Sequence, residues 1–178
     1  MYQMGANVSL KKFGVGGKFI CDKGRTTLDL ENGVYPEYLI SYTSSDDLLR
    51  LAGQIDLLVK EGNDIIVMDW KTNKEIKTKS GFNTQTKTTA KMLYPLNNLD
   101  DCNFQHYTLQ LSTYAWMLQQ VNPEFNIRDL IMIHFDHEGK QTVYHLDYLK
   151  KEVEDMLNFY KKENKKAKQK AKYKRIEY

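Results

Sequence analysis

The stretch LAGQIDLLVKEGNDIIVMDWK, residues 51–71, decides the fold of this chain. Val, Ile and Leu dominate residues 51–60 and 64–71, which is the composition expected of β-strands. Between them, Gly62 and Asn63 are residue types that adopt the left-handed backbone of a tight hairpin turn. With these two residues as the turn, Asp56 is predicted to lie directly opposite Asp69.

Side chains alternate between the two faces of a strand, so the faces of this hairpin follow from the sequence. One face is predicted to be apolar and contains Leu51, Gly53, Ile55, Leu57, Val59, Ile66, Met68 and Trp70. The other face carries the polar residues among apolar ones: Gln54, Asp56, Asp69 and Lys71 with Ala52, Leu58, Ile65 and Val67. Opposed carboxylates with Cβ atoms about 5 Å apart repel each other unless a cation lies between them. The hairpin therefore indicates a divalent-metal site, and the alternative is a surface hairpin whose polar face is solvated.

Three motifs in order along the chain carry a family resemblance. They are Gly53-Gln54-Ile55-Asp56, Asp69-Trp70-Lys71-Thr72 and Gln110-Leu111-Ser112-Thr113-Tyr114, with Pro36-Glu37 on the preceding strand. Together they resemble the PD-(D/E)XK nuclease superfamily, and within it the RecB-like branch. Residues 92–118 also resemble nuclease-like proteins of large viruses and bacteriophages. The likeness covers about residues 34–118 and implies a restriction-endonuclease-like α/β core, a central mixed sheet flanked by helices.

The resemblance implies a role for each motif residue. Asp56, Asp69 and Lys71 would be catalytic, and Mg²⁺ or Mn²⁺ would be held by Asp56, Asp69, the carbonyl of Trp70 and Glu37. Lys71 would orient or deprotonate the attacking water. Gln110 and Tyr114 share one helical face with Tyr107, and together with Lys74 they would bind substrate. For Glu37, an ordinary strand glutamate is the alternative, and for Gln110 and Tyr114 ordinary helix residues.

One feature of the branch is missing from the sequence. Members usually have an N-terminal helix with a His or Glu that completes the metal site, but residues 1–33 contain no histidine and six glycines, which disfavour a long helix. Either that helix is absent or the chain is a piece of a longer protein. Cys21 and Cys102 also cannot supply the four ligands of an iron–sulfur variant.

The whole chain is the size of one domain. Its 178 residues suffice for a substantial core, and no run of apolar residues is long enough to span a membrane. Two cysteines without framework spacing indicate a reducing, cytoplasmic setting, either of a cell or of a host if the protein is viral, in which case the virion is the other location. Residues 161–178 carry a net charge of +7 and the preceding 160 residues −4. We therefore divide the chain into a nuclease-like domain, 1–160, with its motif-bearing core at 33–120, and a basic C-terminal tail, 161–178.

The elements around the hairpin follow from periodicity and caps. Residues 35–42 are predicted to form a strand, and residues 73–91 a long loop whose lysines would help to hold substrate: Lys74, Lys77, Lys79, Lys87 and Lys91. A helix is predicted over residues 103–121, capped by Asp100 or Asp101 and ended by Asn122-Pro123.

Beyond that helix, the pattern predicts a hairpin over residues 129–135 and 141–146, and then a helix starting at Asp147. Its apolar face would contain Leu149, Val153, Met156, Leu157 and Tyr160. In the tail, a solvated helix end and a DNA grip are equal alternatives. Residues 1–33 are predicted to pair loosely as strands.

Two functions are compatible with the sequence. The first is a metal-dependent nuclease acting on single- or double-stranded DNA in replication, recombination or repair, alone or in a larger polypeptide or complex. The second is a non-catalytic nucleic-acid-binding or structural domain with a nuclease fold. A zinc site built from His134, Asp136 and His137, with His106 or Cys102, has no recognised ligand spacing and is the weakest alternative.

Overall fold

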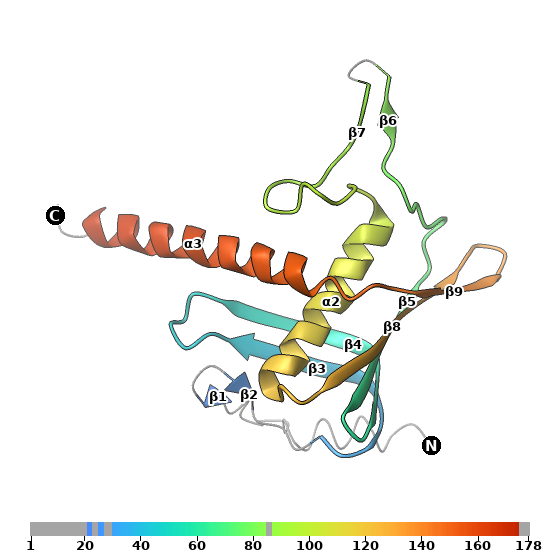
Figure 1. Cartoon of the computed structure of the whole chain (residues 1–178), viewed down its shortest axis with the longest axis horizontal. Helices are drawn as coiled ribbons and strands as arrows, with labels where there is room; N and C mark the ends of the chain where they lie inside the picture. The colour runs from blue at the N-terminus through green and yellow to red at the C-terminus, as the bar shows by residue number, and fades with distance from the viewer. Residues whose placement is uncertain (1–20, 23–24, 27–29, 85–86, 175–178) are drawn as a thin grey trace.

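A five-stranded mixed sheet forms the centre of the computed structural model, which describes residues 21–22, 25–26, 30–84 and 87–174 (Figure 1). The strand order is β3-β4-β5-β8-β9, and β5 and β8 run parallel while the other neighbours run antiparallel. The strands are β3 (Gly33–Thr43), β4 (Arg50–Glu61), β5 (Asp64–Lys71), β8 (Asn126–Phe135) and β9 (Gln141–His145). Two helices, α2 (Asn103–Val121) and α3 (Lys150–Lys174), flank the sheet. The predicted restriction-endonuclease-like α/β core is thus confirmed.

The hairpin of β4 and β5 has the predicted register. Leu57 pairs with Met68 and Glu61 pairs with Asp64, with Gly62 in the left-handed region at φ 59°. The β4–β5 ladder ends at the Leu57–Met68 pair. Asp56 and Asp69 therefore lie one position beyond the last ladder pair.

The prediction of one continuous apolar face on β4 is wrong. Ile55 and Leu58 are both buried, at 1% and 0% exposure, although they differ by three positions and alternation alone would put them on opposite faces. The β3–β4 ladder passes from Pro36–Leu57 directly to Tyr38–Ile55, and Glu37 between them has a left-handed φ of 52°. At this interruption the alternation of buried and exposed side chains along β4 is displaced by one residue. As a result, Ile55 on one side of the interruption and Leu58 on the other are both buried.

Helix α2 has the predicted bounds but not the predicted cap. Cys102 is the N-cap residue, and no side-chain hydrogen bond caps the helix there. Asp100 instead pairs with Lys91 at 2.5 Å, and Asp101 contacts His106 at 2.7 Å, so neither carboxylate is available to the helix. The inward face of α2 packs against β3, β5 and β8, and its centre consists of fully buried residues, among them Leu111, Ala115 and Leu118.

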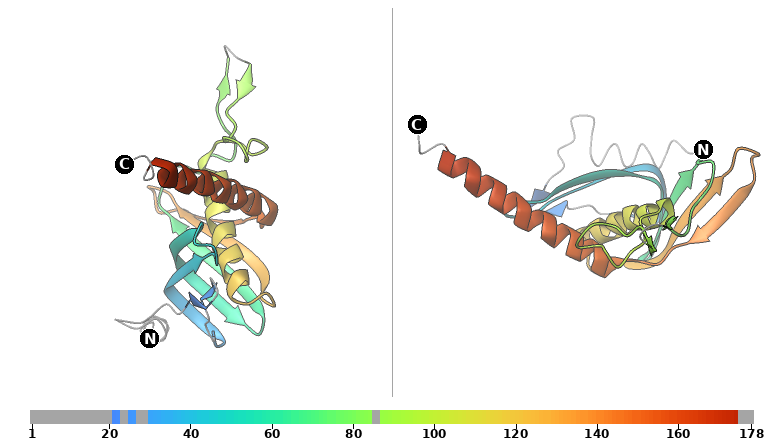
Figure 2. Two further views of the ribbon diagram at one scale, coloured as in Figure 1. Left: turned by 90° about the vertical axis from the view of Figure 1, so that its left-hand side faces the viewer. Right: turned by 90° about the horizontal axis from the view of Figure 1, so that it is seen from above.

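The region predicted as a long loop contains a short hairpin of its own. Strands β6 (Phe82–Asn83) and β7 (Thr88–Thr89) pair antiparallel and project from the body (Figures 1 and 2). The base of this region is tied to α2, because Lys77 N–H donates to Asn103 Oδ1 and Asn103 Nδ2 donates to the carbonyl of Glu75. The hairpin predicted after α2 is β8–β9, with β8 starting earlier, at Asn126.

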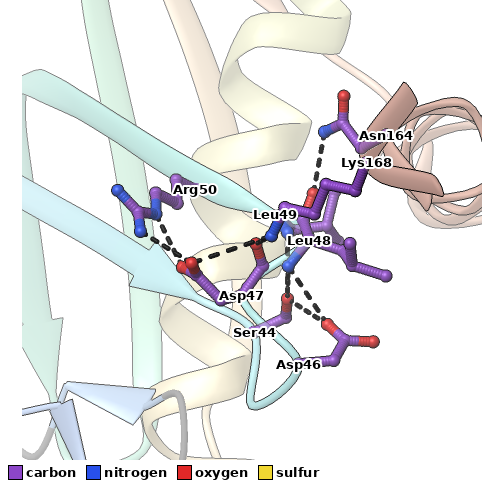
Figure 3. Close-up of polar contacts among 8 residues, drawn as sticks. All are labelled: Ser44, Asp46, Asp47, Leu48, Leu49, Arg50, Asn164 and Lys168. Carbon is purple, nitrogen blue, oxygen red and sulfur yellow. Dashed lines mark hydrogen bonds and ion pairs between the residues drawn. The ribbon is translucent and has the colours of Figure 1, made fainter. Parts of the chain in front are cut away.

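Helix α3 starts at Lys150, three residues after the predicted Asp147, and runs to Lys174. Residues 161–174 of the predicted tail thus continue the helix, and part of this segment docks on the β3–β4 turn (Figure 3). Asn164 Nδ2 donates to the carbonyl of Leu48 at 2.8 Å, and Lys168 Nζ donates to that of Asp47 at 2.7 Å. On the predicted apolar face, Val153 and Leu157 are buried, but Tyr160 is 51% exposed.

Two small strands near the N-terminus, β1 (Cys21–Asp22) and β2 (Arg25–Thr26), pair with each other, in line with the predicted pairing in residues 1–33. The prediction that no long helix lies there falls mostly outside the described residues. Among the described helices, none combines the length and apolarity that crossing a membrane requires.

Candidate active site

Asp69 and Lys71 lie at the C-terminal end of β5. Asp69 is buried, at 3% exposure, because β5 is a central strand covered by α2. Lys71 Nζ lies 2.5 Å from Asp69 Oδ2, and since this oxygen has no hydrogen-bond partner among the described residues, the contact is an ion pair outside hydrogen-bond geometry. A buried carboxylate needs a positive partner, and Lys71 supplies it here.

Asp56 lies directly beyond the Leu57–Met68 pair, where the β4–β5 ladder ends. Its Oδ2 accepts a hydrogen bond from the backbone N–H of Trp70 at 2.9 Å, while the Trp70 side chain is 38% exposed. Burial raises the pKa of Asp69 above its ordinary value, Lys71 lowers it in part, and the charge of Asp56 raises it further. The structure thus brings the two predicted acids into one electrostatic environment with Lys71.

The predicted residues of α2 surround Lys71. Its Nζ donates to Gln110 Oε1 at 3.2 Å and lies 4.6 Å from the centroid of the Tyr107 ring. Gln110 Nε2 in turn donates to the hydroxyl of Tyr114 at 3.2 Å. The spacing of Tyr107, Gln110 and Tyr114 on one helical face therefore serves to position the lysine.

The close approach of the Tyr114 ring to β4 explains why the first motif begins with a glycine, Gly53. A Cβ at this position would lie 2.4 Å from Cε1 of Tyr114 and 3.0 Å from its Cζ, far inside normal contact distance. The first and third motifs therefore meet in space, and the glycine allows the tyrosine ring to lie directly on β4.

Two residues of the site, Asn73 and His134, were not predicted as part of it, since the sequence suggested His134 only for the alternative zinc site. The hydroxyl of Tyr107 donates to Asn73 Oδ1 at 2.7 Å, and Nε2 of the buried His134 contacts the carbonyl of Asn73 at 2.6 Å. His134 is the parallel-sheet partner of Lys71. The available signal was a histidine inside an alternating strand, but only the pairing of β8 with β5 places it here.

Other predicted site residues lie at the edge of this arrangement. Glu37 is exposed and its carboxylate accepts a hydrogen bond from Nε2 of Gln54 on the neighbouring strand. Lys74 is exposed at the start of the loop. Among the remaining loop lysines, Lys77 pairs with Glu75 at 3.1 Å and Lys91 pairs with Asp100.

The donor set suits a hard divalent cation bound by few protein ligands. Mg²⁺ commonly uses one or two carboxylates and completes its coordination with water and substrate phosphate oxygens. Asp56 and Asp69 supply two carboxylates, and the buried Oδ2 of Asp69 is the oxygen that contacts Lys71 Nζ at 2.5 Å. Within the described part of the chain, no three His, Cys, Asp or Glu side chains gather as a metal-binding group.

A mixed sheet with an acid-x-lysine pair at the end of one strand and an acid on its hairpin partner defines a restriction-endonuclease-like protein. The sequence comparison agrees, since residues 13–177 match the PD-(D/E)XK nuclease superfamily, and the chain belongs to this family. A solved structure named "Crystal structure of SSO0001" is similar at 15% identity and a TM-score of 0.39, over 71% of this chain and 50% of that one. This chain thus spans half the length of that solved chain. No curated protein matches the sequence significantly.

Proposed function

We propose that this chain is a divalent-metal-dependent nuclease that hydrolyses DNA phosphodiester bonds. The observation that carries the proposal is Asp69, a carboxylate with 3% exposure that faces the charge of Asp56 and contacts Lys71 at 2.5 Å. Burying like charges together destabilises a fold, and such groups cluster where chemistry requires them.

Each residue has a task in this proposal. Asp56 and Asp69 would hold Mg²⁺ or Mn²⁺, with the carbonyl of Trp70 and, as predicted from the resemblance, Glu37 as further oxygen donors. The bound cation would supply charge neutralisation at the phosphate and make water more acidic. Glu37 needs to release Gln54 to take part, since its carboxylate is engaged there.

Lys71 is the residue that orients the attacking water: as an ammonium group it donates from Nζ and its charge favours hydroxide, while the proton of the water passes to solvent. Gln110 Oε1 at 3.2 Å and the face of Tyr107 hold the ammonium group beside the two acids. A positive charge fixed in a partly buried site stabilises both hydroxide and the developing charge on phosphate. Gln110, Tyr114 and Lys74 would then contact the backbone or a base of the nucleic acid.

The biological assignment extends the same proposal. We place the chain in the RecB-like branch on its three motifs, with a viral or bacteriophage origin suggested by residues 92–118. Its role would be in replication, recombination or repair in the cytoplasm, alone or within a larger polypeptide or complex.

A cleavage assay tests the activity. End-labelled single- and double-stranded DNA is incubated with the protein and Mg²⁺ or Mn²⁺, alongside Lys71→Ala and Asp69→Asn. We expect cleavage by the wild type and a rate at least about 100-fold lower in both variants, because Lys71→Ala removes the charge that holds the attacking water and Asp69→Asn removes a carboxylate that would hold the metal. Lys60→Ala is the matched control, because Lys60 lies on the same hairpin but donates to the carbonyl of Gly62 in its turn.

The competing function is a non-catalytic nucleic-acid-binding or structural domain. It is favoured by the engagement of the Glu37 carboxylate with Gln54. DNA binding by the wild type without cleavage in either metal would support this function, and equal cleavage by wild type and Lys71→Ala would show that the lysine is wrongly assigned.

A further inference from the structure

An exposed apolar segment lies beside the candidate active site. Leu93 is 88% exposed and Tyr94 is 71% exposed, although Met92 and Leu96 on either side are buried. Backbone hydrogen bonds from Met92 N–H to the carbonyl of Leu99 and from Leu96 N–H to that of Leu93 fix the segment. The two exposed side chains are therefore presented outward by a well-anchored backbone.

Helix α3 adds a second ring to this segment. Phe159 is 37% exposed and packs edge-to-face on Tyr94, with ring centroids 5.4 Å apart and an interplanar angle of 85°. Figures 1 and 2 show the segment that follows β7 beside the first turns of α3. We call Leu93, Tyr94 and Phe159 the aromatic surface.

Two cavities flank the aromatic surface, and one of them shares Gln110 with the candidate active site. The first, of about 540 Å³, has Gln110 in its wall, whose side chain also accepts from Lys71 Nζ. The second, of about 520 Å³, is lined by Tyr94 and Phe159 together with charged residues of α3. Because Leu93 lines the first cavity and Tyr94 the second, the two lie on either side of one short segment. Both volumes are in the range of about 300–1,000 Å³ for pockets that bind organic groups.

Charged side chains of α3 line part of the second cavity. Lys162 and Lys166 line it, together with the carboxylates of Asp155 and Glu163. Both carboxylates have cationic partners, since Asp155 pairs with Lys151 at 2.5 Å and Glu163 with Lys166 at 2.6 Å. The two lysines and two carboxylates of the lining balance in charge, and Lys162 is exposed and has no ion pair with a carboxylate of the described residues.

We propose that the aromatic surface and its two cavities bind unpaired nucleotides of the substrate strand next to the scissile phosphodiester. This inference rests on the proposed nuclease function and names a single strand as the substrate in this region. Aromatic rings stack on bases whose faces are free, and a lysine beside them binds the phosphate between two bases. In a duplex the base faces are already stacked on one another, so the aromatic surface cannot stack on them.

The continuity with Lys71 is what favours nucleic acid over a second copy of the chain. Gln110 contacts Lys71 and also lines the first cavity, and Leu93 of that cavity is followed directly by Tyr94 of the second. A strand held at Gln110 would therefore meet Leu93 first and Tyr94 and Phe159 after it. An interface between copies would have no need of Gln110, which links the first cavity to Lys71.

Binding measured without cleavage tests the inference. In EDTA, fluorescence anisotropy of labelled single-stranded and duplex oligonucleotides is recorded for the full chain and for the Tyr94→Ala/Phe159→Ala double variant. We expect the Kd for single-stranded DNA to rise about tenfold or more, as for loss of base–aromatic stacking, and the Kd for duplex to change less than about twofold. Tyr160→Ala is the matched control, because Tyr160 is the next residue of α3 and is 51% exposed but lines neither cavity.

A second variant covers the case in which the double variant does not fold. Lys162→Ala is expected to lower the slope of log Kd against log salt concentration by about 0.7 for single-stranded DNA, the value of one phosphate contact, whereas Lys140→Ala in the β8–β9 turn is not. Unchanged single-strand binding, or an equal loss in Tyr160→Ala, would overturn the inference. So would a wild-type dimer in sedimentation that the double variant loses, because the surface would then join two copies. Failure of the nuclease proposal looks different, since the wild type would bind but not cleave.

Discussion

A methyl group at Gly53 tests how the site is built. In Gly53→Ala, the new carbon would lie 2.4 Å from Cε1 of Tyr114, whereas carbon atoms in contact stay about 3.5–4.0 Å apart. The ring therefore has to retreat by roughly 1 Å, away from β4 and within the packed interface of α2. Overpacking of this kind costs about 1–3 kcal/mol.

The expected results follow from that displacement. Urea unfolding followed by far-UV circular dichroism should give an unfolding free energy lower by about 2 kcal/mol, and the Tm should fall by about 4–8 °C for a chain of this size. The Tyr114 hydroxyl also moves away from Gln110, which loosens the residue that holds Lys71. The cleavage rate should therefore drop together with stability.

A double-mutant cycle separates the steric explanation from others. With the ring removed in Tyr114→Ala, the Gly53→Ala change should cost less than about 0.5 kcal/mol, because the clash has gone. Gly81→Ala is the control, since a Cβ at Gly81 meets nothing within 4 Å. An equal cost of Gly53→Ala with and without the Tyr114 ring would refute the reasoning.

Three further predictions concern the remaining parts of the fold and site. Burial raises the pKa of Asp69, so in EDTA the Asp69→Asn variant should have a larger unfolding free energy than the wild type at neutral pH. This gain in unfolding free energy should vanish below pH 3.8, the ordinary pKa of the carboxyl group, and grow as pH rises from there through the raised pKa. Urea titrations at a series of pH values measure it. Tyr107→Leu should slow cleavage about tenfold by removing the ring face from Lys71, and Tyr107→Phe should slow it less, in a single-turnover assay. Asn164→Ala should lower the unfolding free energy by about 1 kcal/mol by removing the hydrogen bond to Leu48, and an unchanged urea midpoint would contradict this.

Local chemistry made the most informative elements predictable. The Gly62–Asn63 turn fixed the register of β4 and β5, so the pairing that sets Asp56 near Asp69 followed from sequence. The bounds of α2 followed from its apolar period and from Asn122-Pro123. These features depend on residues near one another in the chain, where turn propensity and periodicity act directly.

Features that depend on distant residues were not predictable. The cap of α2 was misassigned because Asp100 pairs with Lys91 and Asp101 contacts His106 in the first turn of the helix, and helix-capping patterns indicate neither contact. His134 reaches Asn73 only because β8 pairs in parallel with β5, across 61 residues of sequence. The sequence alone indicates that residues around His134 form an alternating strand, but it does not indicate which strand lies next to it in the sheet.

The interruption at Glu37 and Asp56 shows why the regular pattern had to fail at the site. A continuous β3–β4–β5 sheet would satisfy each backbone group in the ladder and leave the Asp56 carboxylate with no structural task. Here the β4–β5 ladder ends at Leu57–Met68, and Asp56 accepts the Trp70 N–H that follows. The same position shifts the buried face from Leu58 to Ile55, so that the interior stays apolar on both sides of the acid. The hairpin register sets Asp56 near Asp69, and the break in alternation keeps the side chains on both sides of Asp56, Ile55 and Leu58, buried.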